Sequence, residues 1–592
     1  MTREGRSAPR AAPVLRVAAA LGMIVASGCT SARARPAGSV AHVPAGSDTV
    51  YSLDARLLAM TDQRQADTAL VDRLLTDPDA RRRARTALAI GQVRIRARYP
   101  RLRQLLVDGD TSIAASAAYA LGIAKDSGAV MVLARALDGA PDAVAREAAW
   151  ALGEIGEPAR GVLSIALGAG QARPLIGSPV AQRVAAVRAA AVLATVKLRP
   201  APVALVLPWL ADADAEVVRA AAYVVARLRA PAGVRAVLAV RAHTDEEVRQ
   251  HVARTLSRST VGDSLALVAR EALGSLLGDP SQRVRINAVR SAASFGAVMA
   301  DDVERRLRDP APNVRMAAAE SFAEVAGRDA ARWQRAWDAD TLLAVRRTLL
   351  PQARARSVDL APGIEATWAA VNDWRYRIAA LNTVERDAPL RPDTAIARRL
   401  LTDADERVQR AARARLGPRD SAVVRALRST APVPRPLAEY EALVQRYVLS
   451  DAPATRAFID TDHGTVTLEL FGREAPLVVE AFVRLATTGV YRNTIFHRVV
   501  PNFVVQDGDA SGDGSGSAGF TLRESWTRQR HERGCLGLAT AGPDTGGSQY
   551  YMCHSSQPHL DGGYTVFGRV IDGFDVMDRI VQGDRMVRVR VQ

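Results

Sequence analysis

The chain has 592 residues, of which 48% are hydrophobic and 24% charged, and this composition excludes a disordered or collagen-like chain. Its formal net charge is +16, and all but two of its 79 basic residues are arginine, so nucleic acid or another anionic surface is the first class of partner to consider. Three cysteines in this length exclude a protein built on a disulfide framework.

The N-terminus has the pattern of an export signal over residues 1–28. Basic residues up to Arg16 precede an apolar run over residues 17–28, which is shorter than the roughly 20 residues that a membrane-spanning helix needs. The run ends at Ala26-Ser27-Gly28-Cys29, which resembles the lipobox of bacterial lipoproteins. That resemblance implies cleavage after Gly28 and a lipid on Cys29. The alternative is an ordinary signal peptide with an incidental cysteine.

Residues 29–50 are rich in Ser, Ala, Gly and Pro and predict a flexible tether. No later apolar run in the sequence is long enough to span a bilayer. We therefore expect an exported protein that faces the periplasm. A lipid on Cys29 would anchor it to a bacterial envelope membrane, and we expect this to be the outer membrane. An exported protein rarely meets nucleic acid, so we expect no nucleic-acid partner despite the charge.

Residues 51–417 repeat with a period of about 30. Ala87, Ala120 and Ala151 occupy similar positions in short similar segments, 33 and 31 residues apart. Asp279-Pro280 recurs 30 residues later as Asp309-Pro310. Such a period predicts stacked helix pairs, with Asp-Pro ending one helix and starting the next. The pattern resembles HEAT-like repeats. The resemblance implies an α-solenoid that presents a surface to a protein partner, whose identity the sequence leaves open.

Two features of the repeats have a structural and a functional interpretation. Trp333, Trp337, Trp368 and Trp374 form either an exposed binding patch or part of the repeat core, and we favour the core. The arginine-rich faces either grip an anion or are solvated surfaces with carboxylate partners four residues away, and we favour the solvated surfaces.

The chain changes character after the repeats. Residues 418–454 contain a proline-rich linker and one more amphipathic helix over 437–448. From residue 455 the sequence is richer in Gly, Thr and β-branched residues. Residues 465–470 alternate as a half-buried strand does, and residues 475–487 predict a helix that begins near Pro476. Several short strands with glycine turns predict a small barrel.

Three segments of residues 455–592 resemble the signatures of cyclophilin-type peptidyl-prolyl isomerases, in the family's order and spacing. They are residues 496–509, 539–551 and 560–570. The resemblance implies a closed antiparallel barrel of eight strands capped by two helices. It also implies cis/trans isomerisation of X-Pro bonds in polypeptide clients, without a cofactor.

Rotation about an X-Pro amide faces a barrier of about 18–20 kcal/mol because the planar bond is stabilised by resonance. In the twisted state the prolyl nitrogen becomes an acceptor, so a fixed donor aimed at it lowers the barrier. By resemblance, Arg498 is this catalytic donor, and its alternative is a surface ion pair. By the same resemblance, Gln506 is a second catalytic residue that supports the arginine and the substrate carbonyl. The substrate-binding positions that the resemblance implies are Phe503, Val504, Ala539, Thr540, Ala541, Gln549, Tyr551, His559, Leu560 and Tyr564.

Some residues of this segment depart from the family pattern or allow another interpretation. Asp507 stands where a glycine is common, which predicts a lower rate if the backbone has a positive φ there. Tyr551 replaces a common phenylalanine, and its hydroxyl needs a partner. The histidines near Cys535 and Cys553 fit no standard zinc pattern, so we predict no metal site. The two cysteines form either a disulfide or two small buried residues.

These observations predict an isomerase that assists the folding of exported or envelope proteins. The repeats would then be an arm that docks a partner or a client. The alternative function is a scaffold that binds proline-containing segments without turnover.

Overall fold

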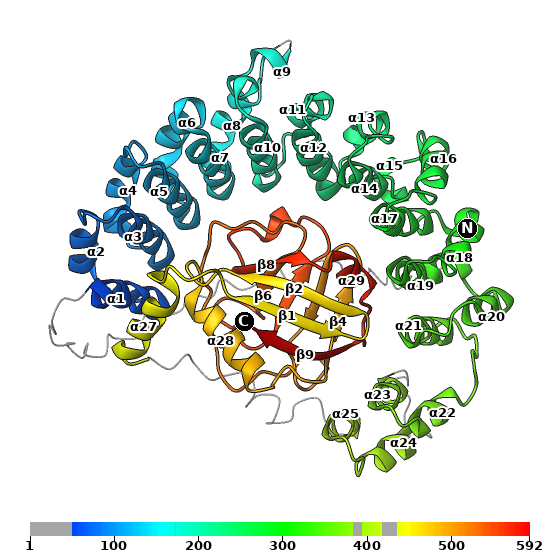
Figure 1. Ribbon diagram of the computed structural model, residues 1–592. Coiled ribbons are helices and arrows are strands. Elements are labelled where there is room, and N and C mark those ends of the chain that lie inside the picture. The colour runs from blue at the N-terminus through cyan, green and yellow to red at the C-terminus, as the bar shows by residue number, and fades with distance from the viewer. Residues whose placement is uncertain (1–49, 172, 383–392, 417–434) are drawn as a thin grey trace, which may run out of the picture. The chain divides into compact units, whose positions relative to one another are not determined.

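The structure is a computed structural model that describes residues 50–171, 173–382, 393–416 and 435–592 (Figure 1). The chain divides into two units, residues 1–48 and 49–592, and the description below concerns the second. The predicted signal peptide and Cys29 lie outside the described residues, as does most of the proline-rich linker. No helix among the described residues combines the length and the apolar character that crossing a bilayer requires.

Helix pairs stacked in two rows make up the first two thirds of the described chain, as the period of about 30 predicts. From α1 to α21, each helix of the inner row packs on the next inner helix, and α23 packs on α25. After α1 (Val50–Gln63), the inner row consists of α3 (Ala80–Val93), α5 (Thr111–Ala124), α7 (Asp142–Ile155), α10 (Ala185–Ala194), α12 (Ala215–Leu228), α14 (Glu246–Thr255), α17 (Gln282–Ala293), α19 (Pro312–Ala326), α21 (Leu343–Arg354), α23 (Trp374–Asn382) and α25 (Glu406–Leu416).

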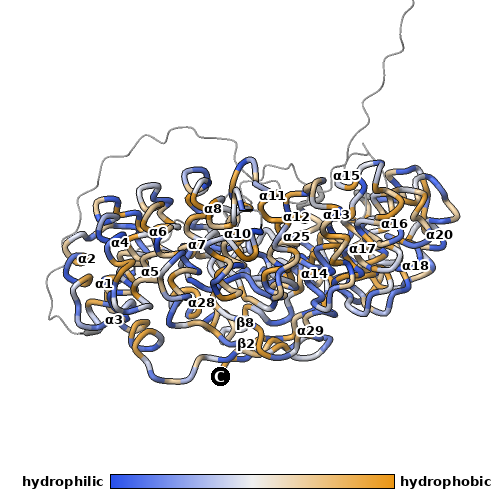
Figure 2. Tube along the Cα trace, turned by 90° about the horizontal axis from the view of Figure 1, so that it is seen from above, coloured by the Kyte–Doolittle hydropathy of each residue, from blue (hydrophilic) through white to orange (hydrophobic). Residues whose placement is uncertain are grey.

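Shorter helices form the outer row and connect the inner ones. They are α2 (Thr68–Leu74), α4 (Tyr99–Leu105), α6 (Val130–Gly139), α8 (Arg160–Ala166), α9 (Pro174–Gly177), α11 (Val203–Val206), α13 (Val234–Ala239), α15 (Arg258–Val261), α16 (Ala266–Leu276), α18 (Ala300–Arg306), α20 (Ala330–Ala339), α22 (Ile364–Ala370) and α24 (Asp393–Leu400). Figure 2 shows hydrophobic and hydrophilic residues alternating along these helices, as expected of helices that are buried on one side.

Small residues allow the inner helices to approach one another closely. A Cβ atom at Gly91 would lie 2.7 Å from the Ala120 carbonyl oxygen, and one at Gly122 would lie 2.8 Å from the Ala151 Cα. Ala120, Gly122 and Ala151 belong to the repeated segments from which the period was predicted. The repeat therefore conserves the small contact surface that sets the spacing of the inner row.

Arginine–aspartate pairs join consecutive repeats, which corrects the expectation of partners four residues away. The aspartate lies in the loop before an inner helix, where it also accepts a backbone N–H of that helix or loop, as Asp309 does from Ala311. Its arginine partner comes from the preceding repeat, so the charges neutralise each other across the repeat boundary. The closest N–O distances are 2.7–2.8 Å in Arg188–Asp212, Arg249–Asp279, Arg285–Asp309, Arg315–Asp340 and Arg377–Asp403.

The tryptophans of the array belong mainly to its core, as predicted. Trp333, Trp337 and Trp368 are buried, and the ring of Trp333 meets Phe322 edge to face. Trp374 is half-buried and lies under the guanidinium of Arg407, 3.7 Å from the ring centroid. Three of the four aromatic side chains are therefore packing residues of the repeats.

The C-terminal domain is a curled antiparallel sheet of nine strands in the order β3-β9-β1-β2-β8-β6-β7-β5-β4. The strands are β1 (Arg456–Thr461), β2 (Gly464–Leu470), β3 (Thr494–Ile495), β4 (Arg498–Val500), β5 (Val504–Asp507), β6 (Cys535–Leu538), β7 (Tyr550–Cys553), β8 (Val566–Asp572) and β9 (Arg585–Val591). Two helices, α28 (Pro476–Thr487) and α29 (Phe574–Arg579), accompany the sheet, and α28 begins at the predicted proline.

The expected closed barrel is not confirmed, because the sheet is open between β3 and β4. Among the described residues, β3 pairs only with β9 and β4 only with β5, and no ladder joins the two edge strands. Only Phe496 and His497 separate β3 from β4 in the chain. The two edges therefore follow one another along one stretch of backbone, and the sheet forms a half-barrel.

The sheet domain contacts the inner row of helices within residues 49–592 (Figure 1). The helix α27 (Leu437–Leu443) confirms the amphipathic helix predicted to begin at residue 437. It packs on α1, and the Tyr440 hydroxyl donates to the Asp62 carboxylate at 2.7 Å. Further along the row, side chains of one part donate hydrogen bonds to backbone carbonyl oxygens of the other. They include Tyr119 to Thr527 O, Asn502 to Arg283 O, Arg290 to Pro501 O and Asn313 to Ile580 O, at 2.6–2.9 Å.

Candidate active site

Arg498 and Gln506 face each other on neighbouring strands. They are direct partners in the β4–β5 ladder, and Arg498 Nη1 donates to Gln506 Oε1 at 3.2 Å. Gln506 Nε2 in turn donates to Gln549 Oε1 at 2.9 Å. The Gln549 amide is itself fixed, because its Nε2 donates to the carbonyl oxygens of Gly514 and Gly516. A glycine-rich loop thus orients the arginine through two glutamines.

The guanidinium of Arg498 is exposed and free of acidic partners. No ion pair to this side chain occurs in the described part of the chain, so the surface ion-pair interpretation does not apply. The guanidinium lies 5.5 Å from the centroid of the Phe503 ring. Desolvation lowers the pKa of Arg498, and the opposing influence comes from Tyr564. An arginine remains charged under such a shift, so it keeps its donors for a bound molecule.

An apolar cluster lies beside this arginine. Val504, Tyr551 and Val566 are its buried members together with two cysteines, and Phe503, Ala539, Leu560 and Tyr564 pack against them. The structure therefore brings together six of the residues predicted to bind substrate. Because a proline ring is apolar, burying it against such a surface is favourable.

The hydroxyl of Tyr551 has the partner that its burial requires. Tyr551 is 5% exposed, and its hydroxyl lies 2.9 Å from Nε2 of His531, whose Nδ1 lies 2.9 Å from the carboxylate of Asp561. Burial raises the pKa of Tyr551. The sequence analysis considered His531 only as one of the histidines near Cys535 and Cys553. The signal that could have found it is the tyrosine itself, because a buried hydroxyl in place of a phenylalanine needs a polar neighbour.

His559 forms the side of the site that touches the helical array. Its ring stacks on Phe503 with the centroids 5.9 Å apart, and its Nδ1 lies 3.3 Å from the hydroxyl of Tyr223 on α12. Burial, and then the nearby charges of Arg227 and Arg254, lower the pKa of His559 to about 3. The imidazole is therefore neutral at pH 7. Nothing in the sequence pairs Tyr223 with a residue 336 positions away.

The backbone at residues 539–541 is available to an extended peptide. Ala539 N–H donates to Gln549 O at 3.0 Å, and Ala541 N–H donates to Thr545 Oγ1 at 2.9 Å. Between them, neither the N–H nor the C=O of Thr540 makes a hydrogen bond within the described residues. Free main-chain groups next to an apolar cluster can pair with the main chain of a bound polypeptide.

Comparison with known proteins identifies the family. A model of the family described as cyclophilin type peptidyl-prolyl cis-trans isomerase/CLD matches residues 457–591, and a model of HEAT repeats matches residues 67–153. A peptidyl-prolyl cis-trans isomerase of Helicobacter pylori is 43% identical over 137 residues, which are 22% of this chain and 84% of the relative. The chain belongs to the cyclophilin-type peptidyl-prolyl isomerases.

Two further relatives cover the same part of the chain. A peptidyl-prolyl cis-trans isomerase of Synechococcus elongatus is 40% identical over 139 residues, and peptidyl-prolyl cis-trans isomerase B of Bacillus subtilis is 41% identical over 140. Each match covers 23% of this chain and 96% or 98% of the relative. The cyclophilin domain thus matches nearly whole enzymes, and the chain is a peptidyl-prolyl cis-trans isomerase preceded by HEAT repeats.

Asp507 of the cyclophilin domain does not have the backbone conformation that was expected to lower the rate. It ends β5 with an ordinary φ, and the positive φ of +94° belongs to Gly508. A Cβ atom at Gly508 would lie 2.2 Å from the Ser548 carbonyl oxygen, so glycine is required at that position. The expectation was wrong because the aspartate precedes the turn and the glycine makes it.

The cysteines and histidines of the cyclophilin domain form no metal site in the described residues, where no group of three or more candidate ligands converges. Cys535 and Cys553 are free, buried thiols whose Sγ atoms lie 2.9 Å apart. Of the two interpretations of these cysteines, the structure has the pair of small buried residues. They lie in the apolar cluster behind Tyr551.

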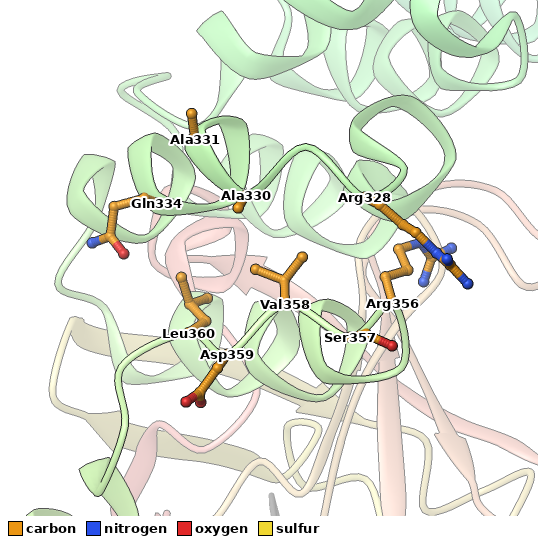
Figure 3. Close-up of a pocket in the computed structure, with 9 residues that line it drawn as sticks. All are labelled: Arg328, Ala330, Ala331, Gln334, Arg356, Ser357, Val358, Asp359 and Leu360. Atoms are coloured by element: carbon orange, nitrogen blue, oxygen red, sulfur yellow. The ribbon is translucent and has the colours of Figure 1, made fainter.

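A pocket in the HEAT array is separate from the cyclophilin site. It encloses about 640 Å³ between the beginning of α20 and the segment 356–360. Figure 3 shows the side chains of Arg328 and Arg356 directed to the same side of this pocket. Its lining contains no residue of the cyclophilin domain. The isomerase site is instead the open surface around Arg498.

Proposed function

We propose that Arg498 is the catalytic donor of the isomerase and that the apolar cluster holds the proline ring. The observation that carries this proposal is the fixed, charged and unpaired guanidinium beside that cluster. Gln506 and Gln549 orient it, so little reorganisation is needed when a twisted prolyl amide forms below it. Thr540 would pair with the client main chain. Rotation then needs neither a nucleophile nor a titrating group.

The variant Arg498→Ala tests this role. We expect kcat/KM for an X-Pro peptide to fall by about 10²–10³-fold, as it does when a donor to a transition state is removed. Protease-coupled or NMR exchange kinetics measure the rate. Arg569→Gln is the matched control, because Arg569 is an exposed arginine of β8 paired with Glu469. Equal rates in wild type and Arg498→Ala would contradict the proposal.

The alternative of a scaffold without turnover loses two of its supports and keeps the third, the long repeat array. One was a strained backbone at Asp507, which has an ordinary φ. The other was the unpartnered hydroxyl of Tyr551, which is bonded to His531. Neither departure from the family pattern therefore weakens the case for catalysis.

We infer that the isomerase acts on exported or envelope proteins from a lipid anchor at Cys29. The support is the basic, apolar and small-residue pattern of residues 1–29 in the sequence. Metabolic labelling with a palmitate analogue, followed by membrane fractionation, tests it. We expect label and membrane association in wild type and neither in Cys29→Ser. Mass spectrometry that finds an unprocessed N-terminus in the cytosol would contradict the inference.

We also propose that the array docks a protein partner or client. Since the inner row contacts the cyclophilin domain, the outer row and the free ends of the array are the surfaces that support this role. Cross-linking of the full chain in the envelope, followed by peptide mapping, tests it. Cross-links from outer helices such as α6 and α16 to one protein are expected. Cross-links confined to the cyclophilin domain would count against docking by the array.

A further inference from the structure

The last turns of three consecutive inner helices lie along the His559 side of the site. On α12, Arg227 follows Tyr223 by one helical turn, and on α14, Arg254 follows His251 by one turn. Residues three or four apart share a helix face. The ring of His251 meets Tyr223 edge to face at 5.4 Å, so the two helices present these faces to each other beside His559.

The third helix, α17, contacts the loop that precedes Phe503, so it lies at the Phe503 end of this row of side chains. Arg290 donates to the Pro501 carbonyl oxygen at 2.8 Å, two residues before Phe503. The row therefore forms a wall that is continuous with the proline pocket. It runs from Arg498 over Phe503 and His559 to Tyr223 and the arginines of α12 and α14.

Two arginines on this wall lack the carboxylate partners found elsewhere in the array, whereas Arg290 pairs with Glu320 at 2.8 Å. Arg227 and Arg254 make no ion pair or side-chain hydrogen bond within the described residues, and Arg254 is half-buried. Burial lowers the pKa of Arg254; Tyr223 opposes this shift, and Arg227, Arg229 and Arg290 add to it. The carboxylate of Asp561, whose charge acts on Tyr223, is bonded to the backbone and ring of His531.

We propose that Arg227 and Arg254 form an anion-binding extension of the substrate groove, which selects clients with a carboxylate side chain close to the X-Pro bond. A guanidinium is weakly hydrated and presents a planar set of donors that matches a carboxylate. A client carboxylate would supply the partner that these two arginines lack. The proposal rests on the proposed function of the pocket around Arg498.

Matched peptides measure this selection in the full chain. Each pair carries Glu or Gln at one position, from three residues before the proline to three after it. For at least one position, we expect kcat/KM to be about tenfold higher for the Glu peptide at low ionic strength, the effect of one hydrogen-bonded charge. The ratio should approach one in 1 M NaCl, where the screening length falls to about 3 Å.

The double variant Arg227→Gln/Arg254→Gln should reduce the Glu/Gln ratio to about one. The control Arg235→Gln/Arg270→Gln, on the outer helices α13 and α16, should keep the wild-type ratio. Because the ratio compares two peptides on one protein, partial loss of folded enzyme does not change it. A ratio of one at every position in wild type, or an unchanged ratio in the double variant, overturns this proposal alone. Absence of turnover with every peptide would instead overturn the proposed function.

Discussion

Asp507 shows how one buried side chain can link the stability of the cyclophilin domain to pH. The residue has no exposed surface, and its carboxylate accepts hydrogen bonds from Thr494 Oγ1 at 3.1 Å and from the Gly508 N–H. Tyr491 and Tyr550 are also close to it. Burial raises the pKa of Asp507 well above that of an exposed aspartate, because the ionised form is poorly solvated there.

The variant Asp507→Asn should therefore stabilise the domain at high pH. The unfolded chain releases the Asp507 proton at a lower pH than the folded chain does, so raising the pH from about 4 favours unfolding until the folded pKa is reached. An amide carries no such penalty and still accepts from the Gly508 N–H. We expect a gain on the order of 2 kcal/mol at pH 8 that shrinks toward pH 4.

Thermal unfolding at pH 4, 6 and 8 measures this difference. Asp451→Asn is the control, because Asp451 is exposed before β1 and should show the same small effect at each pH. A gain for Asp507→Asn that is independent of pH would show that the carboxylate is not the cause.

At the scale of the element, inner helices such as α10, α14, α17, α19 and α23 are each tied to the next repeat by an arginine. Arg285 of α17 donates to the Asp279 carbonyl oxygen at 2.8 Å, before its own helix, and pairs with both carboxylate oxygens of Asp309 at 2.8 and 2.9 Å. The period and the Asp-Pro boundaries could be predicted from the sequence because they are local patterns. The arginine–aspartate pairing could not, because it links positions 24 apart and depends on how the repeats stack.

The variant Arg285→Ala should destabilise the array by about 3 kcal/mol, since it leaves a buried carboxylate with only the longer contact to Arg306 at 3.5 Å. The Asp309 side chain is 1% exposed and that of Arg285 11%. Arg305→Ala is the matched control. Its side chain is 68% exposed and pairs with Asp302 on the same helix, so we expect a loss below about 1 kcal/mol. Urea unfolding followed by circular dichroism compares the two, and equal losses would contradict the assigned role of the pairs.

At the scale of the whole molecule, residues 49–592 form one unit because the HEAT array and the cyclophilin domain share buried contacts. The basic balance of the chain lies outside the cyclophilin domain, since residues 455–592 carry 14 arginines and 16 acidic residues. The pocket residues of the cyclophilin domain could be predicted, because they lie in three short continuous segments that resemble the family signatures. Tyr223 and Arg254 could not, because only the packing of distant elements brings them to His559.

A buried ion pair between the HEAT array and the cyclophilin domain allows a test of whether the two parts unfold together. Arg530 of the cyclophilin domain lies over the Trp150 ring, 4.9 Å from its centroid, and donates to Glu147 of α7 at 2.5 Å. The Glu147 side chain is 1% exposed. Glu147→Gln leaves the arginine charge buried without a carboxylate, which should cost about 3–5 kcal/mol. Because the loss falls on the interface, we expect calorimetry to show one transition in wild type and two in this variant.

Two further variants separate the interface from general damage. Glu157→Gln removes an ion pair with Arg160 in which the Glu157 side chain is 59% exposed, so its transition should match wild type. In Glu147→Gln/Arg530→Met the uncompensated charge is gone, and we expect most of the lost stability and the single transition to return. A double variant that unfolds in two steps like Glu147→Gln would show that the charge pair is not what couples the array to the isomerase.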